Sequence, residues 1–205
     1  MTISKIILFG GTFDPIHLGH TSVAAFAADK IKAEKVIFIP AKRSPLKNSL
    51  PKVADADRLA MIALAIEGNN KFELSDFELK KNAPSYTIDT VREFKKLRGR
   101  EVEICWLVGA DCFEDLPYWY KITELIDECS LCVMYRAGYK KPDFTKFIER
   151  WGNQRVEKLQ RNIIQTPLIN ISSTEIRKRL MTGEDVSEML HPSVADYIVK
   201  HGLYK

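Results

Sequence analysis

The stretch that decides the fold is KIILFGGTFDPIHLGH, residues 5–20. After its opening lysine the first part is apolar throughout, which indicates a buried β-strand. Two adjacent glycines, Gly10 and Gly11, come next, and His17 and His20 follow, three positions apart. Glycines between a strand and a helix let backbone N–H groups approach a ligand without an intervening side chain. The stretch therefore predicts a strand, a ligand-binding turn and a helix, in that order.

Apolar runs alternate with amphipathic segments along the rest of the chain. The predicted strands are residues 5–10, 35–40, 71–79, 102–109, 130–135 and, more weakly, 162–170. The predicted helices are residues 20–32, 54–68, 87–99, 118–128, 173–183 and 193–202. Several strands are apolar at every position, as happens when helices cover both faces of a parallel sheet. The sequence therefore predicts an α/β fold with a doubly wound parallel sheet.

The composition fits one apolar core. The chain has 205 residues, 45% of them apolar, and we expect a single domain over residues 1–205 in which the part from about residue 171 onward is an integral subregion. The formal charge is only +4, because 31 basic residues nearly balance 27 acidic ones, so no nucleic-acid partner is indicated. The opening MTISKIILFGG is not a signal peptide, and no apolar run is long enough to span a bilayer. We expect a cytoplasmic protein without a membrane partner, and the sequence leaves open whether it forms a homo-oligomer.

The four cysteines raise the question of a metal site. Cys129 and Cys132 form a CxxC pair, but Cys105 and Cys112 stand at no familiar zinc-site spacing from them. Cys105 and Cys132 also lie inside apolar runs that indicate buried strands. We therefore interpret the cysteines as thiols of the core, and we predict no metal ligands among the side chains.

The two histidines carry the chemistry of the opening stretch. Their spacing puts both imidazoles on one face of the first helical turn, where the helix dipole and the free N–H groups favour anions. Three interpretations stay open from the residues alone: a packing turn, a zinc site, and a polyphosphate site, which we favour. A zinc site would need further ligands, and the remaining histidines, His191 and His201, are remote in sequence. The fingerprints GxGxxG and GxxxxGK(S/T) are absent.

A second anion-binding element is predicted in the stretch NISSTEIRKRL. Ser172 and Glu175 have the spacing of a capping box, which places Ser173 and Thr174 on the opening turn of a helix. Arg177 lies four residues after Ser173 and so projects from the same face. Hydroxyl groups, open N–H groups and a guanidinium then converge on one point.

These two elements together resemble the nucleotidyltransferase superfamily that shares its HxGH motif and its fold with class I aminoacyl-tRNA synthetases. The resemblance implies a Rossmann-like nucleotidyltransferase fold with C-terminal helices, and a Mg²⁺-dependent in-line attack by a phosphate oxygen on the α-phosphorus of ATP. It assigns catalysis to His17, His20 and Arg177, with His20 steadying the charge that develops at the α-phosphorus. The implied ATP-binding residues are Gly10, Gly11, Thr12, Phe13, Gly109, Asp111, Ser173 and Thr174. Mg²⁺ is implied to arrive on the ATP phosphates, with no protein ligand of its own.

Two further stretches bear on the acceptor. Residues 84–91, PSYTIDTV, enter a predicted helix with Thr87 near its cap, which offers a hydroxyl and unpaired N–H groups to a carboxylate. In residues 107–126, Asp111 stands at the end of a strand, where it can accept hydrogen bonds from a ribose diol. Trp119 follows a proline, at the expected start of a helix, and can lie against a flat cation such as a pyridinium. The alternative for the aromatic residues around Trp119 is plain core packing.

The same stretches resemble the bacterial nicotinate mononucleotide adenylyltransferases, whose motifs run through nearly the whole chain. These motifs are GGTFDPIHxGH, SYTIDT, GAD followed by LPxW, ISSTxIR and a closing PxxVxxYIxxxxLY, which residues from His191 onward resemble. The resemblance implies that the chain joins two small-molecule partners, ATP and nicotinate mononucleotide, in NAD biosynthesis. The implied mononucleotide-binding residues are Lys47 for the phosphate, Trp119 for the ring, and Ser85, Tyr86, Thr87 and Tyr120 around the nicotinate carboxylate. The family commonly has PPHK where this chain has Ser44, Pro45, Leu46 and Lys47.

Two other functions are alternatives at this point. Phosphopantetheine adenylyltransferases share the first histidine motif and an SSTxxR-like helix, but the SYTIDT and LPYW stretches have no obvious use there. A nucleotide-binding regulator that kept the fold without turnover would not need His17, His20, Ser173 and Arg177 together. The polar stretch 137–161 is helical in tendency and matches no motif.

Overall fold

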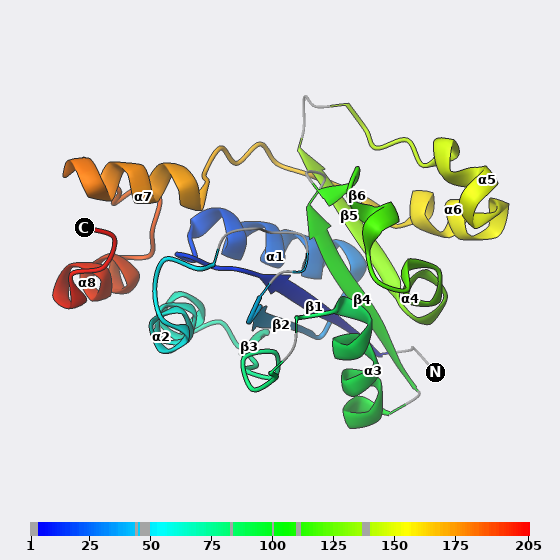
Figure 1. Cartoon of the computed structure of the whole chain (residues 1–205), viewed down its shortest axis with the longest axis horizontal. Helices are drawn as coiled ribbons and strands as arrows, with labels where there is room; N and C mark the ends of the chain where they lie inside the picture. Colours follow the sequence, from blue (N-terminus) through cyan, green and yellow to red (C-terminus); the bar gives the residue numbers. More distant parts are fainter. Residues whose placement is uncertain are drawn as a thin grey trace.

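The computed structural model of the chain describes residues 4–43, 45, 50–82, 84–99, 101–109, 112–136 and 140–205. Its centre is a six-stranded sheet in which every neighbouring pair of strands is parallel (Figure 1). The strands are β1 (Ser4–Gly11), β2 (Lys35–Pro40), β3 (Phe72–Leu74), β4 (Val102–Gly109), β5 (Ser130–Arg136) and β6 (Ile163–Thr166). Their order is β3-β2-β1-β4-β5-β6, so the chain winds outward from β1 in one direction and from β4 in the other. This confirms the predicted doubly wound parallel sheet.

Helices connect the strands and follow the last of them. The α-helices are α1 (Leu18–Ile31), α2 (Asp55–Ile66), α3 (Thr87–Arg98), α4 (Ile122–Glu128), α5 (Ile148–Trp151), α6 (Asn153–Arg161), α7 (Ser173–Thr182) and α8 (Pro192–His201). Two short 3₁₀ turns are η2 (Leu116–Tyr118) and η3 (Thr145–Phe147). Three expectations are wrong in extent: the strand expected over residues 71–79 ends at Leu74, the strand expected over residues 162–170 ends at Thr166, and the helix expected over residues 118–128 begins only at Ile122.

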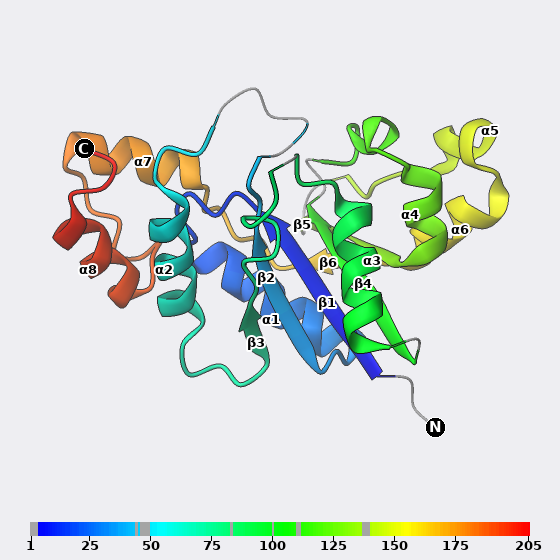
Figure 2. The ribbon, with the colours of Figure 1, turned by 60° about the horizontal axis from the view of Figure 1, so that its bottom comes forward.

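Both faces of the sheet are covered, and an apolar core lies on each. β1 serves the two cores alternately, with Ile7 and Phe9 in one and Ile6 and Leu8 in the other. Helices α1, α2, α7 and α8 contribute to the first core, and α3, α4, α5 and α6 contribute to the second. Figure 2 shows α2, α7 and α8 gathered at one side of the sheet and α4, α5 and α6 at the other. Burial on both faces explains why the central strands are apolar at every position.

The two glycines at the end of β1 are required by packing inside the protein. A Cβ atom on Gly10 would lie 2.4 Å from the ring of Trp106, which belongs to the neighbouring strand β4. A Cβ atom on Gly11 would lie 2.9 Å from the ring of Phe13. Both distances are far below van der Waals contact, so any larger residue would displace a buried aromatic ring. The sequence predicts these glycines from ligand approach alone, and the two aromatic contacts are a second reason that it does not reveal.

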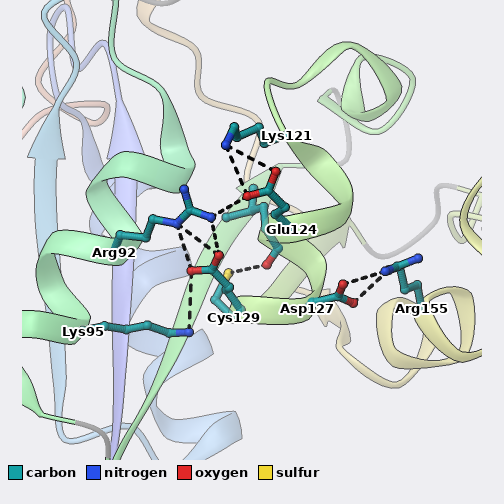
Figure 3. Close-up of polar contacts among 9 residues, drawn as sticks. Arg92, Lys95, Lys121, Glu124, Asp127, Cys129 and Arg155 are labelled. Carbon is teal, nitrogen blue, oxygen red and sulfur yellow. Dashed lines mark hydrogen bonds and ion pairs between the residues drawn. The ribbon is translucent and has the colours of Figure 1, made fainter.

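Ion pairs fix α3, α4 and α6 to one another (Figure 3). The guanidinium of Arg92 on α3 donates to Glu124 and Glu128 on α4. Arg155 on α6 donates to Asp127 on α4 through two nitrogens. Hydrogen bonds from Arg92 lower the pKa of the Glu124 and Glu128 carboxyls, which therefore stay ionised at neutral pH. The network holds together the two helices, α3 and α4, beside which the residues expected to bind the acceptor lie.

Three of the four cysteines lie in the core as predicted, and Cys112 is half-buried against it. Cys105 on β4 and Cys132 on β5 are buried, as is Cys129, and all three are free thiols. Burial raises the pKa of the Cys129 thiol to about 12, so the thiol stays protonated at neutral pH. The prediction of buried thiols in these strands is confirmed.

Candidate active site

The candidate site lies at the carboxyl edge of the sheet. β1 ends at Gly11 and β4 ends at Gly109, and these two strands are neighbours at the point where the winding of the sheet reverses. Open α/β sheets bind their ligands at such a point, outside the carboxyl ends of the strands. Residues 12–17 leave β1 here and lead into α1, as the sequence predicts.

The histidine pair opens α1. His17 is the N-cap residue of the helix, and its backbone N–H donates to Nδ1 of His20 at 3.2 Å. The two imidazole rings stack with their centroids 3.7 Å apart. Gly19 makes room for this arrangement, since a Cβ atom there would lie 2.9 Å from Nδ1 of His17. Both imidazoles therefore share one face at the positive end of the helix dipole, as predicted.

The hydrogen bond between the two histidines also fixes a tautomer. Because Nδ1 of His20 accepts from the backbone, the neutral ring carries its own proton on Nε2. The ring is held in place by Phe13, whose ring meets it edge-on with centroids 5.1 Å apart. His20 thus offers an Nε2–H donor on a fixed ring, which is the kind of group that binds a phosphate oxygen.

The predicted capping box at the start of α7 is half formed. Ser172 is the N-cap residue, and its Oγ accepts from the backbone N–H of Glu175 at 3.2 Å. The Glu175 carboxylate accepts from Nε of Arg179 at 2.8 Å instead of reaching back to the cap. Ser173 and Thr174 occupy the opening turn of the helix, as predicted.

The two predicted elements meet in space. Oγ of Ser173 donates to the carbonyl oxygen of Pro15 at 2.9 Å, across 158 residues of sequence. Nη1 of Arg177 donates to the carbonyl oxygen of Asp14 at 2.7 Å, and its Nη2 donates to Oγ1 of Thr174 at 3.3 Å. The hydroxyl, the guanidinium and the loop that leads to the histidines therefore lie together.

Asp14 holds the loop that leads to His17, and sequence reasoning missed it. The residue is buried, with 4% of its surface exposed. Its Oδ2 accepts from the backbone N–H of Lys52 at 2.7 Å, and its Oδ1 accepts from the hydroxyl of Tyr204 at 2.7 Å. The sequence identifies Asp14 and Pro15 only as a turn, because no local spacing pairs residue 14 with residue 204.

A buried arginine supports the same loop. Nη1 of Arg58, on α2, donates to the carbonyl oxygen of Thr12 at 2.7 Å, and its Nη2 donates to Asp55 at 2.6 Å. The side chain of Arg58 is fully buried, so these bonds replace the water that the guanidinium loses on folding. Phe13 is left-handed, with φ of 48°, a conformation that a bulky residue adopts only where its surroundings hold it. The backbone on the way to His17 is therefore firmly fixed.

The described residues that are expected to bind the acceptor lie at the start of α3 and in the segment before α4. Thr87 is the first residue of α3 and Tyr86 is its N-cap, as predicted. The ring of Tyr86 lies against the ring of Tyr120, with centroids 4.6 Å apart. Trp119 is half-buried against the core on this face. The expected helix start at Trp119 is wrong, because Trp119 is the C-cap residue that follows η2 and the left-handed Lys121 separates it from α4.

Ser85 ties the start of α3 to the loop that follows β2. Its backbone N–H donates to the carbonyl oxygen of Arg43, and its Oγ accepts from the backbone N–H of Lys42, both at 3.0 Å. Its neighbour Glu78 is 2% exposed and accepts from Oγ1 of Thr90 at 2.7 Å. Burial raises the pKa of Glu78, and hydrogen bonds from Thr90 and Ser85 oppose this rise. Sequence reasoning missed Glu78, because it falls in a run with the pattern of a strand.

The remaining predicted groups are placed only in part. Lys47 and Asp111 lie outside the described residues. Within the described ranges, no three His, Cys, Asp or Glu side chains are grouped so that they could hold a metal ion. The described side chains predicted to bind the phosphates, on His17, His20, Ser173, Thr174 and Arg177, are imidazole, hydroxyl and guanidinium groups, which suit phosphate oxygens better than a divalent cation.

Comparison with known proteins finds relatives that match this chain over nearly its full length. The family described as cytidylyltransferase-like matches residues 8–179. A "probable nicotinate-nucleotide adenylyltransferase" of Caldicellulosiruptor bescii is 39% identical over 202 residues, which cover 98% of this chain and 99% of the relative. The protein of the same name from Clostridium tetani is 37% identical over 205 residues, which cover 99% and 100% of the two chains.

A solved structure shares the fold. Plasmodium falciparum nicotinic acid mononucleotide adenylyltransferase complexed with NaAD matches with a TM-score of 0.75 at 22% identity. The match covers 98% of this chain and 97% of that one. The likeness therefore extends over the whole architecture, including the helices that follow β6.

Proposed function

The chain belongs to the cytidylyltransferase-like family and, within it, to the nicotinate-nucleotide adenylyltransferases, and we propose that it transfers the adenylyl group of ATP to nicotinate mononucleotide. The products are nicotinate adenine dinucleotide and pyrophosphate. The observation that carries the proposal is the contact between the loop of His17 and the opening turn of α7, in a chain that also has an open helix start at Thr87. The His17 loop and the start of α7 supply hydrogen-bond donors for a triphosphate, and the start of α3 supplies donors for the carboxylate of the acceptor.

At the ATP end the chain supplies hydrogen-bond donors and positive charge. His17 and His20 bind phosphate oxygens, and the Nε2–H of His20 stabilises the charge that grows at the α-phosphorus. Ser173, Thr174 and Arg177 hold the β- and γ-phosphates, which leave as pyrophosphate. Arg177 suits this role because its guanidinium has more N–H donors than its two bonds to described residues use.

The rest of the ATP site is proposed to be mostly backbone. Its residues are Gly10, Gly11, Thr12 and Phe13 after β1, and Gly109 and Asp111 after β4. The ATP phosphates would carry Mg²⁺ without a ligand from the described side chains, and the ion would supply further neutralisation of the leaving pyrophosphate. The chain forms no covalent intermediate, because holding the acceptor phosphate in line with the α-phosphorus supplies most of the rate.

At the acceptor end, the open N–H groups of the first turn of α3 bind the nicotinate carboxylate. Thr87 adds its hydroxyl there, and Trp119 stacks on the pyridinium ring. The full proposed set for the mononucleotide is Lys47, Ser85, Tyr86, Thr87, Trp119 and Tyr120. The contact between Tyr86 and Tyr120 supports this set, because it joins the start of α3 to the segment that carries Trp119.

The proposal is tested by comparing acceptors in one assay. We expect the purified protein, with Mg²⁺ and ATP, to release pyrophosphate with nicotinate mononucleotide at a kcat/KM at least about tenfold above that for nicotinamide mononucleotide. The physical reason is that a carboxylate accepts hydrogen bonds from the N–H groups at the start of α3. The NH₂ group of nicotinamide is itself a donor, so it cannot accept from those N–H groups. An equal or higher kcat/KM for nicotinamide mononucleotide would contradict a carboxylate site at the start of α3. Activity with phosphopantetheine alone would replace the proposal by the phosphopantetheine adenylyltransferase alternative.

Trp119→Ala tests the stacking contact. We expect the KM for nicotinate mononucleotide to rise about tenfold, because a desolvated ring–cation contact contributes about 1 to 2 kcal/mol, while the KM for ATP stays unchanged. Tyr118→Ala is the matched control, because Tyr118 is the neighbouring aromatic residue and is 73% exposed. Initial-rate kinetics with each substrate varied in turn measure both constants. An unchanged KM for the mononucleotide would return Trp119 to a packing role.

The proposed partners are the two substrates. No helix in the part of the chain that the structure describes is long and apolar enough to cross a membrane. The cytoplasmic location, the single domain over residues 1–205 and the lack of a nucleic-acid partner stay predictions. Size-exclusion chromatography with light scattering measures the oligomeric state, which the sequence leaves open.

A further inference from the structure

The segment that follows α8 turns back onto the loop of His17. Gly202 caps α8 in the left-handed conformation, with φ of 59°. Two residues later Tyr204 is left-handed again, with φ of 61°. A residue with a side chain adopts that conformation only where its surroundings hold it. The side chain of Tyr204 packs against the first core, and its hydroxyl makes a hydrogen bond to Asp14.

The hydroxyl of Tyr204 reaches a buried carboxylate. It donates to Oδ1 of Asp14 at 2.7 Å, while Oδ2 accepts from the backbone N–H of Lys52 at 2.7 Å. The carbonyl oxygen of Asp14 accepts from Arg177. One residue thus links the loop after β1, the approach to α2, the start of α7 and the segment after α8. Because Asp14 is almost fully buried, water does not readily replace any of these bonds.

The surroundings of Asp14 keep the hydroxyl of Tyr204 protonated, so that it can donate a hydrogen bond. Burial and the hydrogen bond to the Asp14 carboxylate raise the pKa of Tyr204 well above its usual value, so the hydroxyl stays protonated at neutral pH. Arg58 and Arg177 approach the same loop from α2 and α7 and bind the carbonyl oxygens of Thr12 and Asp14. The tyrosine therefore holds the carboxylate without adding a charge beside the guanidinium that faces the triphosphate.

Resting on the function proposed above, we propose that Tyr204 is a positioning residue for adenylyl transfer. Its hydroxyl holds the carboxylate of Asp14, and Asp14 in turn sets the loop that ends at His17. The same loop offers the carbonyl oxygens to which Ser173 and Arg177 donate. Among the described residues, the carboxylate without this hydroxyl keeps its bond to the backbone N–H of Lys52 alone and can turn. The guanidinium and the imidazole pair then lose their fixed separation, which the in-line reaction requires.

Tyr197 provides a matched control on the same part of the chain. It stands on α8, and its hydroxyl donates to Oδ1 of Asp57 at 3.0 Å. Asp57 belongs to α2 and lies outside the loop of His17. Replacing either tyrosine by phenylalanine deletes one hydroxyl that is bonded to one aspartate and keeps the ring. If Tyr204 had only a structural role, its replacement would lower the unfolding temperature but leave the kcat of the folded protein as in Tyr197→Phe.

The first experiment compares the two variants kinetically. Tyr204→Phe is expected to lower kcat about tenfold, because a small misplacement of catalytic groups is costly. Its KM for nicotinate mononucleotide is expected to change by less than about twofold, because the start of α3 is untouched. Tyr197→Phe is expected to change kcat by less than about twofold. Thermal unfolding checks that both variants fold cooperatively.

A second readout does not depend on activity. The amide of Lys52 donates to the carboxylate that Tyr204 holds, so its hydrogen exchange reports on that carboxylate. We expect faster exchange at Lys52 in Tyr204→Phe and no change in Tyr197→Phe. Unchanged exchange in both variants would show that Tyr204 does not hold Asp14.

A double-mutant cycle tests whether Tyr204 acts through Asp14. Asp14→Asn keeps the shape of the side chain and removes its charge. If Tyr204 acts through Asp14, Tyr204→Phe has little further effect on kcat in the Asp14→Asn background. Independent effects, which multiply in kcat, would overturn the inference. If Asp14→Asn does not fold, the kcat ratio of the two tyrosine variants and the exchange at Lys52 decide the question.

The outcomes separate this inference from the function on which it rests. If the unaltered protein releases no pyrophosphate with nicotinate mononucleotide, the proposed function fails, and the role of Tyr204 in the reaction falls with it. If the unaltered protein is active and Tyr204→Phe matches Tyr197→Phe in kcat, only the inference about Tyr204 is overturned.

Discussion

Replacing His20 by alanine is expected to lower kcat by about 10²- to 10³-fold and to change the dissociation constant of ATP by less than about threefold. An N–H donor aimed at charge that develops only in the transition state contributes little to binding of the ground state. In the structure the backbone of His17 already engages Nδ1 of His20, so Nε2 carries the donor. Pyrophosphate release gives kcat, and an equilibrium titration with ATP in the absence of acceptor gives the dissociation constant.

The control for this variant is a histidine outside the site. His201 is exposed at the end of α8, where its ring stacks on Tyr197, and His201→Ala is expected to change kcat by less than about twofold. If kcat and the affinity for ATP fall together in His20→Ala, the imidazole binds ground state and transition state alike. That result would show that the Nε2–H of His20 does not stabilise the transition state specifically.

The parts of the site that could be predicted are those fixed by local geometry. His17 and His20 share a face because helical spacing alone brings residues three apart to one side. Ser172 caps α7 because a hydroxyl at that position can accept from the backbone N–H three residues on. The sheet was predictable for a similar reason, since strands buried on both faces need apolar residues at every position.

Two of the misjudged boundaries have local causes that the sequence pattern does not reveal. The apolar alternation of residues 71–79 continues past Leu74, but the chain turns at Asp76, whose carbonyl oxygen accepts from two backbone N–H groups further on. Before α4, Lys121 adopts a left-handed conformation with φ of 53°, which interrupts the expected helix. Neither a turn inside an alternating run nor a left-handed lysine has a distinctive sequence signature.

The supports of the catalytic loop could not be predicted, because they join segments far apart in sequence. Tyr204 contacts Asp14 across 190 residues, and Arg58 contacts Thr12 across 46. Periodicity shows which face of an element a residue takes, but it does not show which distant side chain meets it there. The sequence therefore predicts the groups that face the phosphates and misses the groups that hold them in place.

Replacing Arg177 by lysine is expected to lower kcat/KM for ATP by about 10²-fold. The guanidinium donates to the carbonyl oxygen of Asp14 and to Thr174, and an ammonium keeps the charge but cannot hold the loop and phosphate oxygens in one plane. Arg179→Lys, on the same helix, is the control: Arg179 pairs with Glu175 at the surface, so less than about a twofold change is expected. The assay varies ATP at saturating nicotinate mononucleotide. Equal losses in the two variants would place Arg177 outside the triphosphate site and leave it as a tie between α7 and the loop.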